Sequence, residues 1–359
     1  MAVLSRDFLF NLESNMRVIQ EAEYRRLTSN LWWNKVARVM PTSAGKEIVN
    51  WILNTAVLEL AGANSDGADP LPKYRDMAIQ QTTFTPKYIA AALKLQRAQF
   101  EDLDGNGVSI ATEWVTQMGA QQAYYPQKNV ASVISNGETG LAYDGLAYFS
   151  NAHLVNPKDS SKGTFANLFT GASASTPATD ANDVAYPGAL NVATSTIEGI
   201  FTGLQNIYGY IGALKMANGL DPRMIRPAGI LCPTRIYPKM LSVLNSQFIA
   251  ATAAGSANTA GGSQDIRGQL AALGYGEVVH CPEFDSDPTS FYIVAEQLAS
   301  SQLGAIVYLD REQPGIRYYT GQDGANVELG RTDELEWIAR GRADAGYGHP
   351  YLLYKVKAS

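Results

Sequence analysis

Charged side chains are scarce in this sequence. Asp, Glu, Lys and Arg make up 17% of the 359 residues, and the formal net charge is −6. Proteins that hold DNA or an anionic membrane non-specifically present an excess of Lys and Arg, so this balance excludes a basic surface of that kind. Because 46% of the residues are hydrophobic, the low charge density also predicts that much of the surface is covered by something other than water.

Cysteine and histidine are few as well. Cys232 and Cys281 are the two cysteines, too few for a disulfide framework or a zinc cluster, and free thiols are favoured over a single bridge. His280 is one of three histidines and precedes Cys281. Neighbours on a strand point to opposite faces, so these two do not form a nucleophile–base pair.

Catalytic motifs are missing from the sequence. It contains no HExxH, CxxC or GxSxG, and "TSAGKE" lacks the first glycine and the final Ser/Thr of a phosphate loop. A cryptic pair of carboxylates stays open as a third-ranked hypothesis. We therefore expect a protein that is not an enzyme and needs no cofactor.

Long hydrophobic runs are absent too. The uncharged run 199–214 is shorter than the ~20 residues of a membrane span, and the longer run 240–264 is rich in Ser, Asn, Thr and Gly. No charged stretch followed by an apolar one opens the chain, which argues against a secretory signal. The expectation is a soluble protein without a membrane partner.

The first regular pattern is an amphipathic helix near the N-terminus. Ser5 is the expected N-cap, and the apolar residues that recur near helical spacing are Phe8, Leu12, Ile19 and Leu27. Trp32 and Trp33 follow without a helical period. Adjacent side chains face different ways in any regular element, so we expect one of the two indoles to need a second surface to cover it.

The next part of the chain leaves alternatives open. Residues 46–62 fit either a helix or a pair of extended segments, followed by a turn-rich tip, "GANSDGADPLP". "IAAALKLQ" alternates as a strand does, although a helix is also compatible with it. A long helix is predicted over 112–135, with Pro126 expected to kink it.

The stretch "DLDGNGVSIATE" (102–113) matches the calcium-loop template D-x-[DN]-x-[DN]-G-x5-E at every fixed position. Ile110 stands at the ninth position, which is usually polar, and the chain has no second loop of this kind. A strand-like segment also stands where the preceding helix of a calcium hand belongs. We therefore favour an acidic turn before the helix, with Ser109 or Thr112 as N-cap, over a calcium site.

The second half alternates helix and strand. After a polar tract at 171–188, expected to be a surface connection, a helix is predicted from Leu190 through Ile197, Leu204 and Ile211. The predicted strands are "AGILCP", "EVVHCPEF", "SFYIVAEQ", "GAIVYLD" and "IRYYTG", with a helix around Leu241 after the first. This order predicts one mixed α/β unit between 190 and 310 and a β-rich end of the chain.

Several stretches together resemble the Mu-like prophage major head subunit family, gpT. They are "VARVMPTSAGKEIVNWI", "FEDLDGNG" before "MGAQQAYYP", "YDGLAYFSNAH", "PAGILCPTRIYPKMLSVLNS" and "SFYIVAEQ". "YDGLAYFSNAH" is the most specific of these. The resemblance extends over most of the chain from about Trp33 onward.

The resemblance implies an α+β fold of the Hong Kong 97 capsid type. It implies an N-terminal arm at 1–44 and an extended hairpin, the E-loop, at 45–85. A peripheral domain with a long spine helix would combine 86–185 and 310–359, and an axial domain would occupy 186–309. The stretch 102–113 would then be the turn between the E-loop's return strand and the spine helix.

The implied function is that of a major capsid protein of a tailed phage or prophage. Copies would assemble as hexamers and pentamers of an icosahedral shell around double-stranded DNA, without sequence-specific binding, in the host cytoplasm and then in the virion. Scaffold, portal and decoration proteins are the other expected partners. The candidate assembly residues in and beside the arm are Phe8, Leu12, Ile19, Trp32 and Trp33. A calcium-binding module that uses 102–113 is the alternative.

Overall fold

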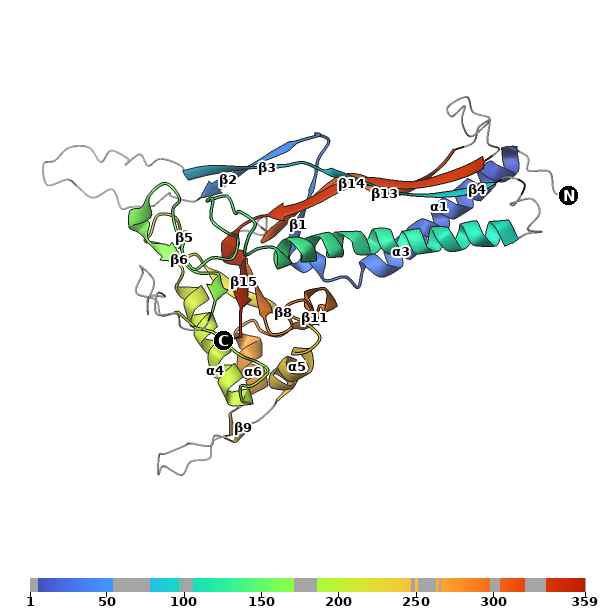
Figure 1. The fold of residues 1–359 in the computed structure, drawn as a ribbon. Helices are drawn as coiled ribbons and strands as arrows, with labels where there is room; N and C mark the ends of the chain where they lie inside the picture. The colour runs from blue at the N-terminus through green and yellow to red at the C-terminus, as the bar shows by residue number, and fades with distance from the viewer. Residues whose placement is uncertain are drawn as a thin grey trace, which may run out of the picture. The chain divides into compact units, whose positions relative to one another are not determined.

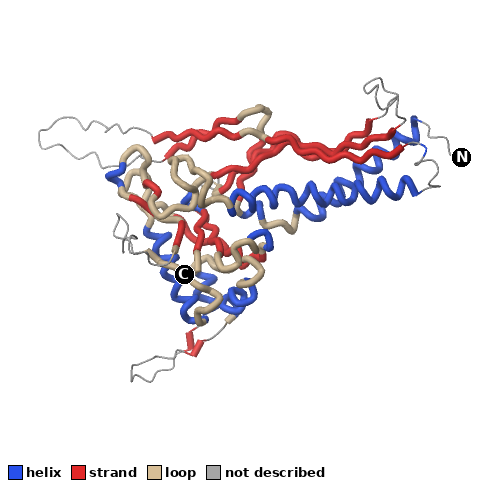
Figure 2. Tube along the Cα trace, viewed as in Figure 1, coloured by secondary structure: helices blue, strands red, loops and turns tan. Residues whose placement is uncertain are grey.

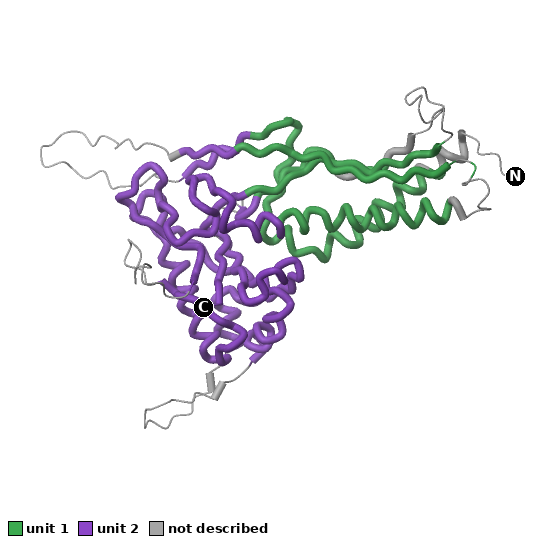
Figure 3. Tube along the Cα trace, in the orientation of Figure 1, with its two compact units in different colours: residues 1–47, 83–130, 307–346 green, residues 48–82, 131–306, 347–359 purple. Residues whose placement is uncertain are grey.

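The computed structural model describes most of the chain, namely residues 6–53, 78–96, 98, 106–170, 186–246, 249–250, 263–264, 266–297, 304–319 and 334–358. The chain forms two compact units, each made of three separate stretches (Figure 3). Unit 1 comprises residues 1–47, 83–130 and 307–346, and unit 2 comprises 48–82, 131–306 and 347–359.

Unit 1 consists mainly of two helices and a four-stranded sheet (Figure 1). The helices are α1 (Arg6–Thr28) and α3 (Asn106–Ser135), of which residues 131–135 belong to unit 2. The strands, in their order across the sheet, are β1 (Ala37–Pro41), β13 (Ile306–Tyr319), β14 (Glu334–Tyr347) and β4 (Lys87–Gln96). A short 3-10 helix, η1 (Trp33–Lys35), precedes β1.

The core of unit 1 follows from the alternation in β14. Leu335, Trp337 and Ala339 are buried, whereas Glu336 and Ile338 between them are half-buried. This inner face packs against Leu12 and Met16 of α1 and against the first turns of α3. A strand with one apolar face needs such a cover to be stable.

The two helices of unit 1 approach each other closely at Gly119. A Cβ at this position would lie 3.0 Å from the Gln20 carbonyl oxygen and 3.3 Å from the Glu23 Cβ. The Gln20 side-chain amide also donates to the Gln122 side-chain oxygen. A glycine on α3 therefore lets α1 lie against it, and the sequence pattern alone gave no sign of this contact.

Several predictions for unit 1 are confirmed, and others are wrong. "IAAALKLQ" is a strand, paired antiparallel with β14. The long helix begins at Asn106, earlier than the predicted Thr112, so neither Ser109 nor Thr112 is its N-cap. The Thr112 hydroxyl instead donates to the Val108 carbonyl inside the helix (2.8 Å). "GAIVYLD" and "IRYYTG" belong to one continuous strand, β13.

Unit 2 is centred on a five-stranded sheet (Figure 2). Its strands, in order, are β11 (Val278–His280), β8 (Ile225–Cys232), β12 (Phe291–Gln297), β15 (Leu353–Val356) and β7 (Leu168–Phe169). The helices are α4 (Ile197–Ala213), α5 (Tyr237–Asn245) and α6 (Ile266–Ala272). β8 and β11 run parallel, and β12 is antiparallel to both β8 and β15.

Shorter elements complete the described part of unit 2. The 3-10 helices are η2 (Ser160–Lys162), η3 (Pro282–Phe284) and η5 (Pro350–Leu352). Three two-stranded sheets pair β2 (Glu47–Leu53) with β3 (Ala78–Phe84), β5 (His153–Leu154) with β6 (Thr164–Phe165), and β9 (Ile249–Ala250) with β10 (Ser263–Gln264). Residues 54–77, the predicted tip, and most of the polar tract at 171–188 lie outside the described residues.

The mixed α/β prediction for 190–310 is confirmed, with two differences. α4 begins at Ile197, not Leu190, because the Thr196 hydroxyl caps it by accepting from the Gly199 N–H (3.1 Å). Leu190 is buried ahead of the helix and packs against Gly203. Furthermore, β7 and β15 join the sheet from outside that range. Both cysteines are free thiols, as predicted.

Candidate assembly surfaces

The candidate residues on α1 lie in the interior of unit 1. Leu12 is 8% exposed and belongs to the core cluster with Met16, and Ile19 is partly buried against the same cluster. Phe8 lies on α1, but its side chain is outside the described part. The apolar side of α1 therefore holds the helix to its own unit, while Val18 on another side is 64% exposed.

The expectation that one tryptophan of the pair needs a second surface is wrong. Trp32 and Trp33 are 4% and 7% exposed within the single chain. The Trp32 backbone N–H donates to Gln127 Oε1 of α3 (3.1 Å), and the Trp33 ring packs against Tyr308 of β13 with centroids 5.1 Å apart. Both indoles are therefore buried within the single chain, and the contacts with Gln127 and Tyr308 are long-range ones that the local pattern does not contain.

The β2–β3 ribbon has apolar side chains on both faces of β2. Val49, Trp51 and Leu53 are buried, and the side chains between them point the other way, with Ile48 55% and Ile52 58% exposed. Alternate residues of a strand face opposite sides. One face of β2 is thus covered by unit 2 while the other presents two isoleucines to the exterior.

The second strand of the ribbon extends this exposed face. The Trp51 indole N–H donates to the Thr82 hydroxyl of β3 (2.9 Å), which places Thr82 on the covered side. Ile79 has the opposite parity and is 40% exposed. We call the exposed side chains of Ile48, Ile52 and Ile79 the isoleucine face, and the exposed Asn50 lies between Ile48 and Ile52 on this side of the ribbon.

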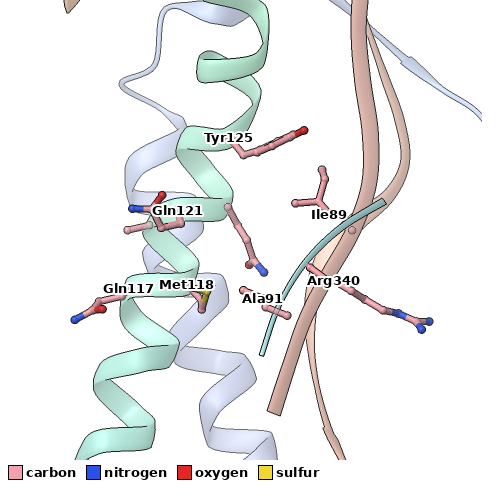
Figure 4. A pocket seen from close by; sticks show the side chains of 12 residues that line it. Ile89, Ala91, Gln117, Met118, Gln121, Tyr125 and Arg340 are labelled. Carbon is pink, nitrogen blue, oxygen red and sulfur yellow. The ribbon is translucent and has the colours of Figure 1, made fainter. Parts of the chain in front are cut away.

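Unit 1 has a cleft beside an edge strand. β4 is the last strand of its sheet, and a cleft of about 610 Å³ lies between it and α3. Figure 4 shows Met118 and Tyr125 reaching from α3 toward Ile89 and Ala91, while Arg340 points away from the helix. An open strand edge next to an apolar cleft is a surface on which another chain can pair and pack.

The specific motif "YDGLAYFSNAH" contains a buried ion pair in unit 2. His153 Nδ1 lies 2.6 Å from Asp144 Oδ2, with the two side chains 0% and 2% exposed. His153 Nε2 lies 3.0 Å from the Tyr148 carbonyl oxygen. Both ring nitrogens thus lie within hydrogen-bond distance of an oxygen atom. The pair ties the two ends of the motif together, which its spacing alone did not reveal.

A second buried cation lies on β15. The Lys355 ammonium contacts Glu138 Oε1 (2.7 Å) and Asp287 Oδ2 (2.8 Å), and Lys357 binds the other oxygen of Glu138 (2.6 Å). Burial opposes the charged form of Glu138, but the hydrogen bonds from Lys355 and Lys357 outweigh it and lower the pKa of this carboxyl. The cluster holds the end of the chain in the five-stranded sheet.

The described half of the calcium motif is helical. Residues 106–113 form the first turns of α3, whereas a calcium loop keeps its ligand positions in an open loop. Asp102 and Asp104 lie outside the described residues. Within the described ranges no group of three His, Cys, Asp or Glu side chains could hold a metal. The helical course of 106–113 differs from the open loop that a calcium site of this type needs.

The histidine next to a cysteine behaves as its position predicts. His280 is exposed and Cys281 is buried, so the two face opposite sides. His280 Nε2 lies 2.9 Å from the Thr234 hydroxyl, and Asp285 accepts from the Thr234 N–H and hydroxyl (both 2.7 Å). These bonds hold the loop between β8 and α5. The hydrogen bonds from Thr234 also lower the pKa of Asp285. This carboxylate therefore acts as a hydrogen-bond acceptor and is a poor candidate for a general base.

The sequence matches two protein-family profiles. Residues 158–356 match the family described as phage capsid protein, and residues 15–181 match the Mu-like prophage major head subunit gpT. The chain belongs to the phage capsid protein family. The resemblance to the Mu-like head subunit is confirmed by the second match, while none of the curated protein sequences matches this chain.

The comparison with solved structures gives matches among phage capsids. The capsid protein of cyanophage P-SCSP1u is 10% identical, with a TM-score of 0.53 over 92% of this chain and 88% of that chain. The procapsid of bacteriophage JBD30 is 14% identical, with a TM-score of 0.47 over 99% and 77%. A JBD30 capsid decorated with minor capsid protein trimers is 12% identical, with a TM-score of 0.42 over 91% and 63%.

The fold is therefore the mixed α/β fold of Hong Kong 97-type phage capsids. The protein is a phage capsid protein, and its place is the virion capsid. It is a structural protein and not an enzyme. Within the described residues, no helix is both long enough and apolar enough to cross a membrane.

Proposed function

We propose that copies of this capsid protein join as hexamers and pentamers in which the β2–β3 ribbon of one copy lies across its neighbour. The observation that carries this proposal is the isoleucine face. Ile48, Ile52 and Ile79 are 40–58% exposed on a two-stranded ribbon, and such a ribbon has little core of its own. Permanent interfaces between subunits are apolar, so a neighbouring copy is the cover that this face fits.

The domain assignment of the family is proposed for this chain. Residues 45–85 act as the E-loop, and residues 1–44 act as the arm. The peripheral domain combines 86–185 with 310–359, α3 is its spine helix, and the axial domain is 186–309. Two features support this assignment: α3 is the longest described helix, and the sheet containing β8 and β11 carries three helices within 186–309.

The candidate residues of the arm are proposed to act in assembly through α1 as a whole. Leu12 and Ile19 hold α1 on unit 1, and Trp32 and Trp33 hold the chain that leaves it. The helix then presents its exposed side, including Val18, to a neighbouring copy. Phe8 belongs to the same helix and is proposed to contribute near its N-terminal end.

Other components of a head complete the proposal. The shell encloses double-stranded DNA by geometry, because a net charge of −6 gives no general attraction for phosphate. Scaffold and portal proteins are proposed as partners during assembly in the host cytoplasm. Decoration by a minor capsid protein, as in the JBD30 capsid, is proposed for the finished shell.

A charge placed on the isoleucine face tests the proposal. We expect the double substitution Ile48→Asp and Ile52→Asp to leave a folded subunit that no longer forms shells, because two carboxylates cannot enter an apolar interface unpaired. The measurement is sedimentation velocity with negative-stain microscopy, and circular dichroism verifies folding.

The matched control is Leu241→Asp, which removes a leucine that is 37% exposed on α5 of unit 2. This control is expected to assemble as the unmodified protein does. Shells formed by the ribbon variant with unchanged yield would contradict the role of the isoleucine face.

A further inference from the structure

A fully buried histidine lies where the β2–β3 ribbon meets the rest of unit 2. His349 is 1% exposed and follows β14 directly. Three aromatic rings surround its imidazole: Trp51 of β2 at 4.7 Å between centroids, Tyr351 of η5 at 4.8 Å and Tyr143 at 5.8 Å. We call these four side chains the aromatic box.

Among the described residues, the ring of His349 has no hydrogen-bond partner. Nδ1 and Nε2 are both buried and unpaired. The backbone of the same residue is well held, since its N–H donates to the Gly304 carbonyl (3.1 Å) and its carbonyl accepts from the Tyr148 hydroxyl (3.3 Å). The position of the residue is thus fixed by its backbone, and the imidazole is enclosed as a neutral ring.

The charged groups around the box disfavour a protonated ring. The Arg223 guanidinium lies 4.0 Å from the centre of the Tyr351 ring, and its charge repels an imidazolium. Asp144 follows Tyr143 in the sequence, but its carboxylate is engaged with His153 and with the Leu146 N–H. Burial, and then the charge of Arg223, lower the pKa of His349 to about 3.

The other titratable groups that face the box offer no counter-charge. Tyr143 and Tyr351 are the remaining ones, from the loop after α3 and from η5, and burial raises the pKa of both phenols so that they stay neutral. Trp51, from β2, does not titrate. A proton on His349 would therefore be unpaired inside the box, which proteins avoid by opening a path to water.

Of the elements that surround the imidazole, we expect the ribbon to need the least free energy to move. Tyr351 is backed by β15 and Arg223 by bonds to the Leu214 and Lys215 carbonyls. Trp51 belongs to a two-stranded sheet, and its indole N–H bonds to Thr82 of the same ribbon, so this bond is kept if the ribbon moves. We propose that His349 makes the attachment of the β2–β3 ribbon acid-labile: protonation of the ring displaces Trp51 and frees the ribbon.

The direction of the effect follows from proton linkage. The closed box binds a proton with a pKa of about 3, and an exposed histidine does so at about 6.5. The open state therefore binds more protons throughout that interval. Attachment is strongest above about pH 6.5, and the fraction open rises by about tenfold for each pH unit below it.

Hydrogen exchange of the full-length protein tests the proposal. After correction for intrinsic exchange, the amides of β2 and β3 are expected to lose about 100-fold of their protection between about pH 6.5 and about pH 4.5. The amides of β8 and β12 in the same unit are expected to keep theirs over this range. Retained protection in the ribbon of the unmodified protein at the lower pH would overturn the proposal.

Two variants separate His349 from the general effects of acid. His349→Phe keeps an aromatic ring in the box but cannot take a proton, so its ribbon should stay protected. His280→Phe removes an exposed histidine elsewhere and should respond as the unmodified protein does. An equal loss in His349→Phe would overturn the proposal. If that variant does not fold, His349→Gln replaces it, because glutamine does not take a proton either. The unmodified protein gives a second test: as the pH falls, the ribbon should lose protection before β8 and β12 do.

This proposal concerns attachment within one copy and does not depend on the proposed contact between copies. Sedimentation of the same samples reports the state of assembly separately. Assembly without an acid-labile ribbon would contradict the role of His349 alone, whereas an acid-labile ribbon in a protein that never assembles would contradict the proposed function alone.

Discussion

The two units bury their sheet faces with different kinds of side chain. In unit 1 the inner face of β14 continues from Trp337 into Ala339, Gly341 and Ala343, and α3 covers it with a cleft left beside β4. In unit 2 the sheet is packed with rings, for example Phe284 against Tyr292 at 4.6 Å between centroids. Small side chains leave space along a helix, whereas large rings fill space and fix their neighbours.

The two units also differ in how far their paired charged side chains are buried. Ion pairs of unit 1 such as Glu21–Arg25 on α1 are exposed. Unit 2 also has an exposed pair, Arg226–Glu296, but in addition it encloses Asp144 with His153 and surrounds Lys355 with carboxylates. An exposed pair contributes little to stability, while a buried pair becomes costly as soon as one partner is lost. We therefore expect unit 2 to tolerate substitution poorly and unit 1 to tolerate it better.

The largest effect is expected from the buried ion pair of unit 2. Asp144→Ala leaves the His153 imidazole enclosed without its carboxylate, and we expect a loss of about 3–5 kcal/mol in the free energy of unfolding of unit 2. Scanning calorimetry with chemical denaturation measures the loss. Glu21→Ala on α1, which breaks an exposed pair, is the control and should leave the unfolding of unit 1 nearly unchanged. Equal effects of the two substitutions would remove the distinction between the units.

A smaller effect is expected from added volume. A Cβ at Gly140 would collide with the Tyr347 ring, whose hydroxyl donates to the Val133 carbonyl (3.0 Å). Gly140→Ala should destabilise unit 2 by about 1–3 kcal/mol, because a packed ring must move. Ala91→Leu adds a larger side chain in the cleft of unit 1 and should change stability by less than about 1 kcal/mol. Thermal unfolding of the two variants compares them, and a greater loss in Ala91→Leu would reverse the comparison.

Local periodicity predicted the elements whose side chains alternate cleanly. β4, β8 and β12 were found where their patterns placed them, and the long helix ends at Ser135 as predicted. Its start was missed because the acidic, glycine-containing stretch before Thr112 reads as a turn, although its second half is helical. Similarly, Leu190 fits a helical period but is buried in the segment ahead of α4.

The sequence pattern did not predict the contacts between distant parts of the chain. Trp32 and Trp33 are both buried and contact Gln127 and Tyr308, which lie far along the chain, so neither indole is uncovered as predicted. The meeting of Trp51 with His349 is likewise a product of the fold. The run "EIVNWIL" does carry a signal that could have been used, since a strand with apolar residues at both parities needs a cover on both faces.

The central claim is that this chain builds a shell, and the mass of the purified protein tests it most directly. Sedimentation velocity combined with electron microscopy should show closed shells, or ring-shaped hexamers and pentamers, far heavier than one 38.8 kDa chain. A folded protein that stays a 38.8 kDa monomer at high concentration would contradict the account.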